Sequence, residues 1–527
     1  MGLKYLPWLI GGLLNAQIIL PFDWVNQAGI TIQDGNILWN QDWVSGPLLF
    51  DGTYTSFPKK FGMAVSDRFQ LLRTGDSREL PHLPDSAFTT SSINYYRGDH
   101  FYDQLGLKAD FGEKDRLISL NGFKRNYGGD HGHYLYPGQG LGPIQQSYRF
   151  DYVSKFSNSV NSFALGRFIT HSGLPDSTVN GRIDDDILSA GLMGLKKGSG
   201  WNINYHGSIF TQRRKIIHST RMDSSRTYLN RVMFSIKIRQ GGFGAGLFAS
   251  AQSIAADNFF RNLHWGGLYG EYSLGPMRVL AGLSLLDDQK SKPYYRVVYT
   301  QVINKSRILA DISFEHNPRH PYFNRDSLSQ QFDSWHRARV NYQFESGKFR
   351  GQVFLSAGKS SNEYFGRKAI YKSITLKADW ELISGWHLNT EYLNQQDTTL
   401  YLPRIGSLVR IGLKGSFYLF KQNLKLNSHL WAQGWLDRKA GFKYDLLNEV
   451  PLLDSGSAQL PSQWNLNFEA SAVVKSVVLS YRLMNILNIV DSFTNGLKEN
   501  QVWLRPTSFY PPLGRFITFG VSWQFRD

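Results

Sequence analysis

The chain alternates apolar and polar side chains with a period of two residues, in segments of about ten residues. In the final segment, the residues that fall on one face are Ile517, Phe519, Val521, Trp523 and Phe525. The same alternation recurs upstream in segments 105–111, 232–239, 374–380 and 464–472. Because successive side chains of a strand point to opposite faces, each segment predicts a strand with one apolar and one polar side.

The length of these segments favours strands that cross a membrane. Many approach the 9–11 residues of a tilted membrane strand, whereas globular strands usually have about 5–6 residues. Aromatic residues often cap the apolar face, as at Phe101 and Phe111 or at Trp523 and Phe525, which is typical of an interfacial girdle. Since lipid does not tolerate open sheet edges, such strands have to close into a barrel.

The predicted fold class is therefore all-β: a large antiparallel transmembrane β-barrel of roughly 20–22 strands, with 16–18 as the alternative count. Gly-containing tight turns are expected at 112–114 and 198–200. Longer loops are expected at 125–146, 171–185, 316–332, 436–461 and 488–511. In membrane barrels the short turns usually face the periplasm and the long loops the exterior.

The N-terminus predicts export. Residues 1–16 (MGLKYLPWLIGGLLNA) have the layout of a signal peptide, with one Lys, a short apolar stretch and small or polar residues; a buried N-terminal segment is the alternative. Residues 17–87 alternate weakly and form an N-terminal extension, a few early strands or an insert in the lumen. Residues 88–527 form the predicted barrel. No later apolar run approaches the roughly 18 residues that a membrane helix needs.

Composition narrows the class further. The chain is 42% hydrophobic and 14% aromatic, with 50 Gly and no Cys. Its mean hydropathy of -0.33 argues against a helical membrane protein. Absent Cys excludes disulfides and thiolate metal sites. The net charge of +16 fits anionic outer-leaflet glycolipid or a cationic lumen, whereas a secretion signal argues against nucleic acid.

The last 64 residues carry a resemblance. An alternating strand from Trp464 is followed by Leu483-Met484-Asn485-Ile486-Leu487-Asn488, a loop, Tyr510-Pro511-Pro512-Leu513-Gly514-Arg515 and the strand FITFGVSWQF. This order resembles the C-terminal end of TonB-dependent receptor barrels. The resemblance implies a 22-stranded outer-membrane barrel, solute uptake, and recognition of the last strand, with Phe525 as its signal, by the barrel insertion machinery.

The N-terminus departs from that family. Only about 70 residues lie between the signal peptide and the first clear strand, which is too few for a complete plug domain. The general pattern also resembles porin-like outer-membrane barrels of Bacteroidota-type bacteria, and capsule-assembly barrels have a comparable length. Energised uptake is therefore left open.

The polar faces of the predicted strands contain candidate lumen-facing cations. They are Lys237, Arg239, Lys377, Arg410 and Lys414. Rings of cationic side chains in a pore favour anions. The alternative is that these residues pair with lumenal acids such as Asp110, Asp379 and Glu469.

Other chemistry-bearing clusters are interpreted as ordinary loop residues. Asp130, His131 and His133 suggest a divalent cation, and the run 184–186 (three Asp) suggests calcium, but neither matches a metal-loop template. The basic run 213–215 suggests contact with lipopolysaccharide phosphate, although solvated loop charge explains it equally. No catalytic motif is present, so neither an enzyme, a metal nor a cofactor is predicted.

Two functions remain at this point. The first is an outer-membrane porin- or receptor-like barrel for a hydrophilic solute. The second is a non-conducting module that binds a surface polysaccharide or a partner protein, with sugars stacking on Tyr134, Tyr136, Tyr294 and Tyr295. The expected partners are outer-membrane lipid and lipopolysaccharide, the insertion machinery, and a periplasmic or surface lipoprotein.

Overall fold

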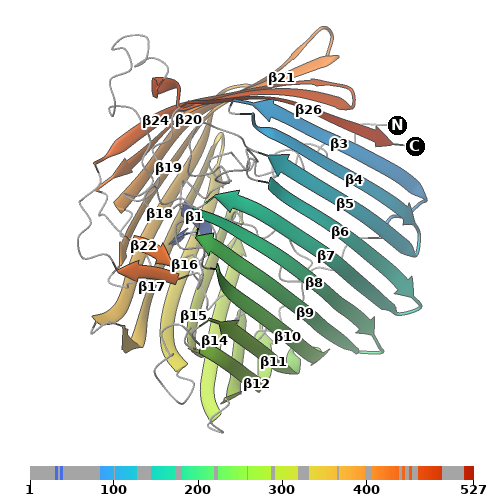
Figure 1. Cartoon of the computed structure of the whole chain (residues 1–527), viewed down its shortest axis with the longest axis vertical. Coiled ribbons are helices and arrows are strands. Elements are labelled where there is room, and N and C mark those ends of the chain that lie inside the picture. Colours follow the sequence, from blue (N-terminus) through green and yellow to red (C-terminus); the bar gives the residue numbers. More distant parts are fainter. Residues whose placement is uncertain are drawn as a thin grey trace.

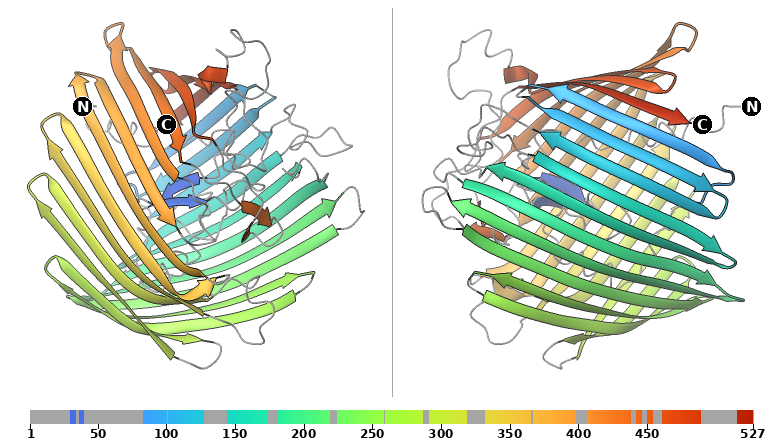
Figure 2. Two further views of the ribbon diagram at one scale, coloured as in Figure 1. Left: turned by 90° about the vertical axis from the view of Figure 1, so that its left-hand side faces the viewer. Right: turned by 45° about the vertical axis from the view of Figure 1, so that its right-hand side comes forward.

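The chain folds into one closed antiparallel barrel (Figures 1 and 2). The computed structural model describes residues 30–33, 36–39, 83–99, 101–126, 144–173, 181–218, 224–257, 259–286, 291–318, 332–364, 367–397, 406–437, 442–445, 450–453, 461–488 and 515–526. Within these ranges no helix is long and apolar enough to cross a membrane.

Twenty-two strands form the barrel, which confirms both the all-β class and the predicted count. They are β3 (Phe88–Gly98), β4 (Asp103–Glu113), β5 (Arg116–Asn126), β6 (Ile144–Phe156), β7 (Ser159–Gly173), β8 (Gly181–Lys197), β9 (Trp201–His218), β10 (Ser224–Gln240), β11 (Phe243–Ala256), β12 (Phe259–Leu274), β13 (Met277–Leu286), β14 (Ser291–Ile303), β15 (Ser306–Pro318), β16 (Phe332–Ser346), β17 (Phe349–Tyr364), β18 (Arg367–Ile383), β19 (Trp386–Asp397), β20 (Gly406–Leu419), β21 (Leu424–Leu436), β24 (Gln463–Val474), β25 (Val477–Met484) and β26 (Phe516–Arg526).

Barrel closure is made by the two ends of the strand sequence. β26 pairs antiparallel with β25 on one side and with β3 on the other, so the last strand seals the sheet against the first. β26 carries Phe519, Val521, Trp523 and Phe525, and the side chains of Phe519, Trp523 and Phe525 are exposed on the outer face. Their role in membrane insertion stays a prediction.

The outer face is apolar around the whole circumference. Large hydrophobic side chains alternate along each strand and are exposed, as at Leu107, Leu165, Ile209, Leu268, Leu355, Ile411 and Leu479. Exposed apolar area on this scale is unfavourable in water and is satisfied by lipid. The exposed outer face also carries aromatic residues towards both strand ends, among them Phe111, Phe156, Tyr228, Phe260, Trp464 and Trp523, as interfacial girdles require.

Several strands are longer than the predicted ten residues. β9 has 18 residues, and β8 and β10 have 17. The predicted loop over 171–185 is wrong at both ends, because β7 continues to Gly173 and β8 already begins at Gly181. The charged residues at the start of β8 interrupt the apolar alternation, but the backbone pairing of β8 with β7 and β9 continues through them. The strands thus extend past the apolar belt on the side of the longer connections.

The opposite end of the barrel has tight turns. Gly241 and Gly275 connect successive strands there with φ of +57° and +54°, the left-handed region that glycine adopts without a Cβ clash. The predicted turn at 198–200 connects β8 to β9 and is confirmed. Short turns lie at one end of the barrel and long connections at the other, and in membrane barrels these ends usually face the periplasm and the exterior, respectively.

Aromatic rings cover glycines on neighbouring strands. Tyr96 lies opposite Gly520, and a Cβ added at Gly520 would lie only 2.2 Å from the Tyr96 ring. Tyr269 covers Gly246 in the same way. Such pairs hide the backbone of a glycine that offers no side chain for packing, and they fix the register of the two strands.

Two short hairpins lie outside the barrel sheet. β1 (Ile30–Gln33) pairs with β2 (Asn36–Trp39), and β22 (Phe442–Asp445) pairs with β23 (Val450–Leu453). β2 approaches β18 and β19, within the outline of the barrel (Figures 1 and 2). The predicted signal peptide, residues 1–16, lies outside the described residues. The assignment of 17–87 stays a prediction beyond the observation that this segment contains the β1–β2 hairpin.

Candidate functional site in the barrel lumen

Charged side chains on the inner face of the barrel pair across neighbouring strands. On β12, Glu271 accepts a bond from Lys237 of β10 at 2.8 Å and from Arg278 of β13 at 2.6 Å. The Glu271 carboxylate is only 1% exposed. Two cations thus share one buried acid near the periplasmic turns.

A second triad lies further around the wall. Asp311 of β15 binds Arg296 of β14 at 2.9 Å and Arg339 of β16 at 2.5 Å. Asp311 is 2% exposed, and both guanidinium groups are largely buried. On β15 and β16, Glu315 and Arg337 extend this ionic layer with a pair at 3.4 Å.

A third triad is the most accessible. Glu391 of β19 binds Lys377 of β18 at 2.9 Å and Arg410 of β20 at 3.3 Å. Arg410 also donates to the side-chain oxygen of Gln433 at 2.9 Å. The side chains of Lys377 and Arg410 are 45% and 35% exposed, so a solute in the lumen can reach both.

Each of the three triads gathers two cations around one carboxylate. A buried carboxylate is tolerated only when its desolvation is offset by close ion pairs and hydrogen bonds. Cationic side chains lining a pore lower the energy of an anion inside it.

The structure brings three of the five predicted cations close together. Lys377, Arg410 and Lys414 lie on β18 and β20, with β19 between them. Lys414 is exposed, and its register partner on β21 is His429. Lys237 and Arg239 lie on β10, where Lys237 is buried in the first triad and Arg239 donates to the Gly241 carbonyl at 3.3 Å.

The acids expected to neutralise these cations have other partners. Asp110 pairs with Lys108 at 2.6 Å. Asp379 pairs with His387 at 2.9 Å, and Glu469 pairs with Arg482 at 3.3 Å. Ion pairing on the polar face was a sound expectation, but the pairs themselves depend on a cross-strand register that the sequence does not display.

The central acids and half of their partners were not predicted from the sequence. These residues are Glu271, Arg278, Arg296, Asp311, Arg339 and Glu391. All six occupy positions of the polar alternation in predicted strands, so their face was predictable. Their grouping into triads was not predictable, because each triad forms only when side chains from three strands meet at one carboxylate.

A buried aromatic cluster extends across β10–β14, which include the strands of the first triad. It consists of Met233, Phe248, Trp265, Tyr269, Leu280 and Tyr294. The ring centroids of Phe248 and Trp265 are 5.1 Å apart, with an edge-on geometry. Because its members are buried, the cluster stiffens the wall of β10–β14 rather than offering free binding surface.

Two interpretations of polar and aromatic residues need correction. Tyr294 and Tyr295 do not lie in a loop: they belong to β14, where Tyr294 is buried in the aromatic cluster and Tyr295 is exposed on the other face. The 184–186 run is not a solvated turn, because it lies in β8 and pairs in register with 213–215 of β9.

The remaining predicted loop residues, Asp130, His131, His133, Tyr134 and Tyr136, lie outside the described residues. Across the part of the chain that the structure describes, no three His, Cys, Asp or Glu side chains gather as metal ligands would.

Comparison with known proteins shows solved structures that share the fold of this chain at low sequence identity. The FrpB iron transporter from Neisseria meningitidis (F5-1 variant) matches with a TM-score of 0.63 and 10% identity, over 91% of this chain and 88% of that chain. The copper transporter OprC matches with a TM-score of 0.61 and 10% identity, over 85% and 82%. The ferric yersiniabactin uptake receptor FyuA from Yersinia pestis has a TM-score of 0.59 and 10% identity, over 84% and 81%.

No protein-family model matches the chain, and no curated protein sequence matches it. The fold is that of the 22-stranded outer-membrane receptor barrels, as the resemblance of the C-terminal segment implied. Identity near 10% shows that fold alone.

Proposed function

We propose that this chain is an outer-membrane barrel of the porin or receptor type, through which a hydrophilic solute passes, and that its lumen favours anions. The supporting observation is the third triad, where the exposed cations Lys377 and Arg410 share the carboxylate of Glu391. The same face of β18–β20 also carries Lys414, Asp379 and Glu381. The similar solved structures include an iron transporter, a copper transporter and a ferric yersiniabactin uptake receptor, which agrees with this proposal.

The size of the effect follows from Coulomb's law. One unit charge about 10 Å from an anion in water changes its energy by about 0.4 kcal/mol, which is about a twofold change in local anion concentration. Salt at 0.1 M screens charges over about 10 Å, whereas at 0.01 M the screening length is about 30 Å. The preference for anions should therefore be strongest in dilute electrolyte.

The test is the reversal potential of the purified barrel in a planar bilayer under a gradient of dilute KCl. We expect the wild type to conduct with chloride favoured over potassium. Lys414→Gln removes one exposed lumenal charge and should lower the chloride preference by up to about twofold. Arg116→Gln, which changes an exposed arginine at a periplasmic turn, is the control and should leave the preference unchanged.

A conducting barrel that prefers potassium, or one in which Lys414→Gln changes nothing, would refute the anion preference. A barrel that stays sealed would refute passage altogether and would favour the non-conducting binding module. The proposal also includes assembly by the barrel insertion machinery and a lipoprotein partner.

A further inference from the structure

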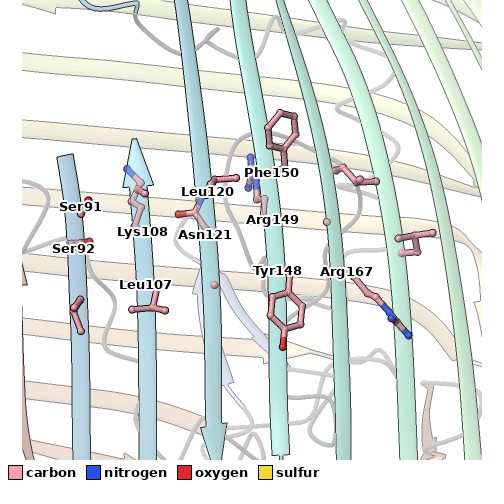
Figure 3. Close-up of a pocket in the computed structure, with 16 residues that line it drawn as sticks. Ser91, Ser92, Leu107, Lys108, Leu120, Asn121, Tyr148, Arg149, Phe150 and Arg167 are labelled. Carbon is pink, nitrogen blue, oxygen red and sulfur yellow. The ribbon is translucent and has the colours of Figure 1, made fainter. Parts of the chain in front are cut away.

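The outer face of the barrel has a groove of about 620 Å³ across β3–β8 (Figure 3). Its outward-facing lining is mostly apolar, with Ser91, Tyr148 and Arg167 as its polar members. The apolar members are Ile93, Leu107, Ala109, Leu120, Gly122, Phe150, Leu165 and Leu188. The alternate residues of the same strands also border it, but their side chains belong to the lumen face. A concave strip of this kind on a lipid-facing wall has the chemistry to hold acyl chains.

The groove is open at Gly122 because this residue has no side chain. It lies on β5 between Leu107 of β4 and Tyr148 of β6 in the strand register. A Cβ added at Gly122 would meet only the Leu107 side chain, at 4.0 Å, so the space beside it is open. Larger residues on both sides form the walls.

The end of the groove that faces the long connections is cationic. Arg167 of β7 lines the groove and is 52% exposed, and Figure 3 shows it at the level of Tyr148. Lys124, also exposed, is one outward position beyond Gly122 on β5. With neighbouring strands about 4.8 Å apart, β5 and β7 are about 10 Å apart, a span that one lipid headgroup can bridge with two long side chains.

Positive charge continues from this rim onto the next strands. Arg213 and Lys215 of β9 share the outward face of the exposed Ile209. Among the described residues of β5–β9, the acids on this face are Asp186, which Arg167 binds at 2.9 Å, and Asp184.

Asp184 binds Arg182 at 2.6 Å and His171 at 2.8 Å. Five Lys and Arg side chains therefore face two carboxylates, without counting His171. An excess of three positive charges lies just above an apolar groove, where phosphates of outer-leaflet lipid would be found.

From this arrangement we propose that the face of β5–β9 binds an acylated, phosphorylated glycolipid of the outer leaflet. An acyl chain occupies the groove at Gly122, and a headgroup phosphate binds between Lys124 and Arg167. Arg213 and Lys215 extend the cationic surface for a second phosphate. The site needs the barrel to lie in a membrane but is independent of what, if anything, crosses the lumen.

The test measures lipid retention by native mass spectrometry of the detergent-purified barrel after incubation with hexa-acylated, bis-phosphorylated lipid A. The comparison lipids are enzymatically dephosphorylated lipid A, phosphatidylglycerol and phosphatidylcholine. We expect lipid A to be retained above the other three, because only lipid A combines several acyl chains with two phosphates.

Two variants separate the parts of the site. Lys124→Gln combined with Arg167→Gln removes the rim charges and should weaken lipid A binding by about 30-fold, at about 1 kcal/mol for each cation near an anionic surface. Gly122→Leu fills the groove and should also weaken binding. Arg116→Gln, on the same strand but beside the periplasmic turn, should bind as the wild type does.

Three results would overturn the proposal. They are equal retention of phosphorylated and dephosphorylated lipid A by the wild type, unchanged retention in the double variant, and loss of retention in the Arg116→Gln control. The comparison of lipids on the wild-type barrel needs no variant, so it tests the proposal even if a variant fails to fold. The heat-modifiable migration of each variant on electrophoresis verifies that its barrel is closed.

Discussion

Replacing Asp311 by Asn tests whether the lumenal triads hold the barrel wall together. The substitution keeps the size of the side chain and removes its charge. Arg296 and Arg339 then face each other across a neutral amide, which cannot compensate two guanidinium groups. The strands β14, β15 and β16 meet at this point, so the repulsion acts on three neighbouring strands.

The magnitude follows from burial. Asp311 is 2% exposed, and Arg296 and Arg339 are 22% and 13% exposed, so water screens the three charges poorly. Removing one partner of a buried ion pair typically costs about 3–5 kcal/mol. The matched control is Glu345→Gln, because its partner Arg350 lies 3.6 Å away at the surface, where both side chains are well exposed. A surface pair of this kind contributes about 0–1 kcal/mol.

The assay is the urea-induced unfolding of the barrel in lipid vesicles, followed by tryptophan fluorescence and by heat-modifiable migration. Asp311→Asn should lower the free energy of unfolding by several times the effect of Glu345→Gln. Adding Arg339→Gln to Asp311→Asn should restore part of the loss, since it removes one of the two repelling charges. Equal effects of the two single substitutions, or no recovery in the double variant, would refute the reasoning.

Three further predictions concern packing and assembly. Gly520→Val forces a side chain into the Tyr96 ring and should destabilise the barrel by about 1–3 kcal/mol in the same urea titration; a neutral result would mean that the ring moves freely. Phe248→Ala empties the centre of the aromatic cluster and should cost about 3–5 kcal/mol, whereas a loss under 1 kcal/mol would show that the cluster is loosely packed. Replacing Trp523 and Phe525 by Ala should slow insertion into vesicles in a stopped-flow measurement, and an unchanged rate would remove the last strand from the insertion step.

Much of the fold was predictable because strand period and turn chemistry are local. The strands that begin at Phe88, Arg116, Trp201, Met277 and Phe349 start where the alternation starts. The two-residue period reports which face a side chain occupies, and lipid on one face makes that period strong. Strand count and facing could therefore be predicted from the chain alone.

Strand boundaries could not be predicted where charged residues interrupt the apolar alternation. The run 184–186 resembles a turn, because acidic residues are depleted in strands. In the barrel these residues continue β8, where Asp184 and Asp186 lie opposite Lys215 and Arg213 of β9. That register is set by the turn at 198–200, so the charge complementarity emerges only once the two strands are aligned.

The lumenal triads illustrate the same limit. Lys237 and Lys377 lie on the face that the alternation predicts, yet their partners, Glu271 and Glu391, are on strands whose register depends on intervening turns. The acid that gathers two cations cannot be distinguished by sequence from an acid that binds one. The face on which a side chain lies depends on one strand, whereas the meeting of two cations at one carboxylate depends on the alignment of three strands.

The central claim is that lipid covers the apolar face of each strand and water the other. Because the chain contains no Cys, Leu120→Cys and Asn121→Cys each give a single spin-labelling site on β5. In vesicles, the label at 120 should be accessible to oxygen and shielded from a water-soluble nickel complex, and the label at 121 should show the reverse. Equal access of the nickel complex to both labels, or the opposite order, would contradict the account.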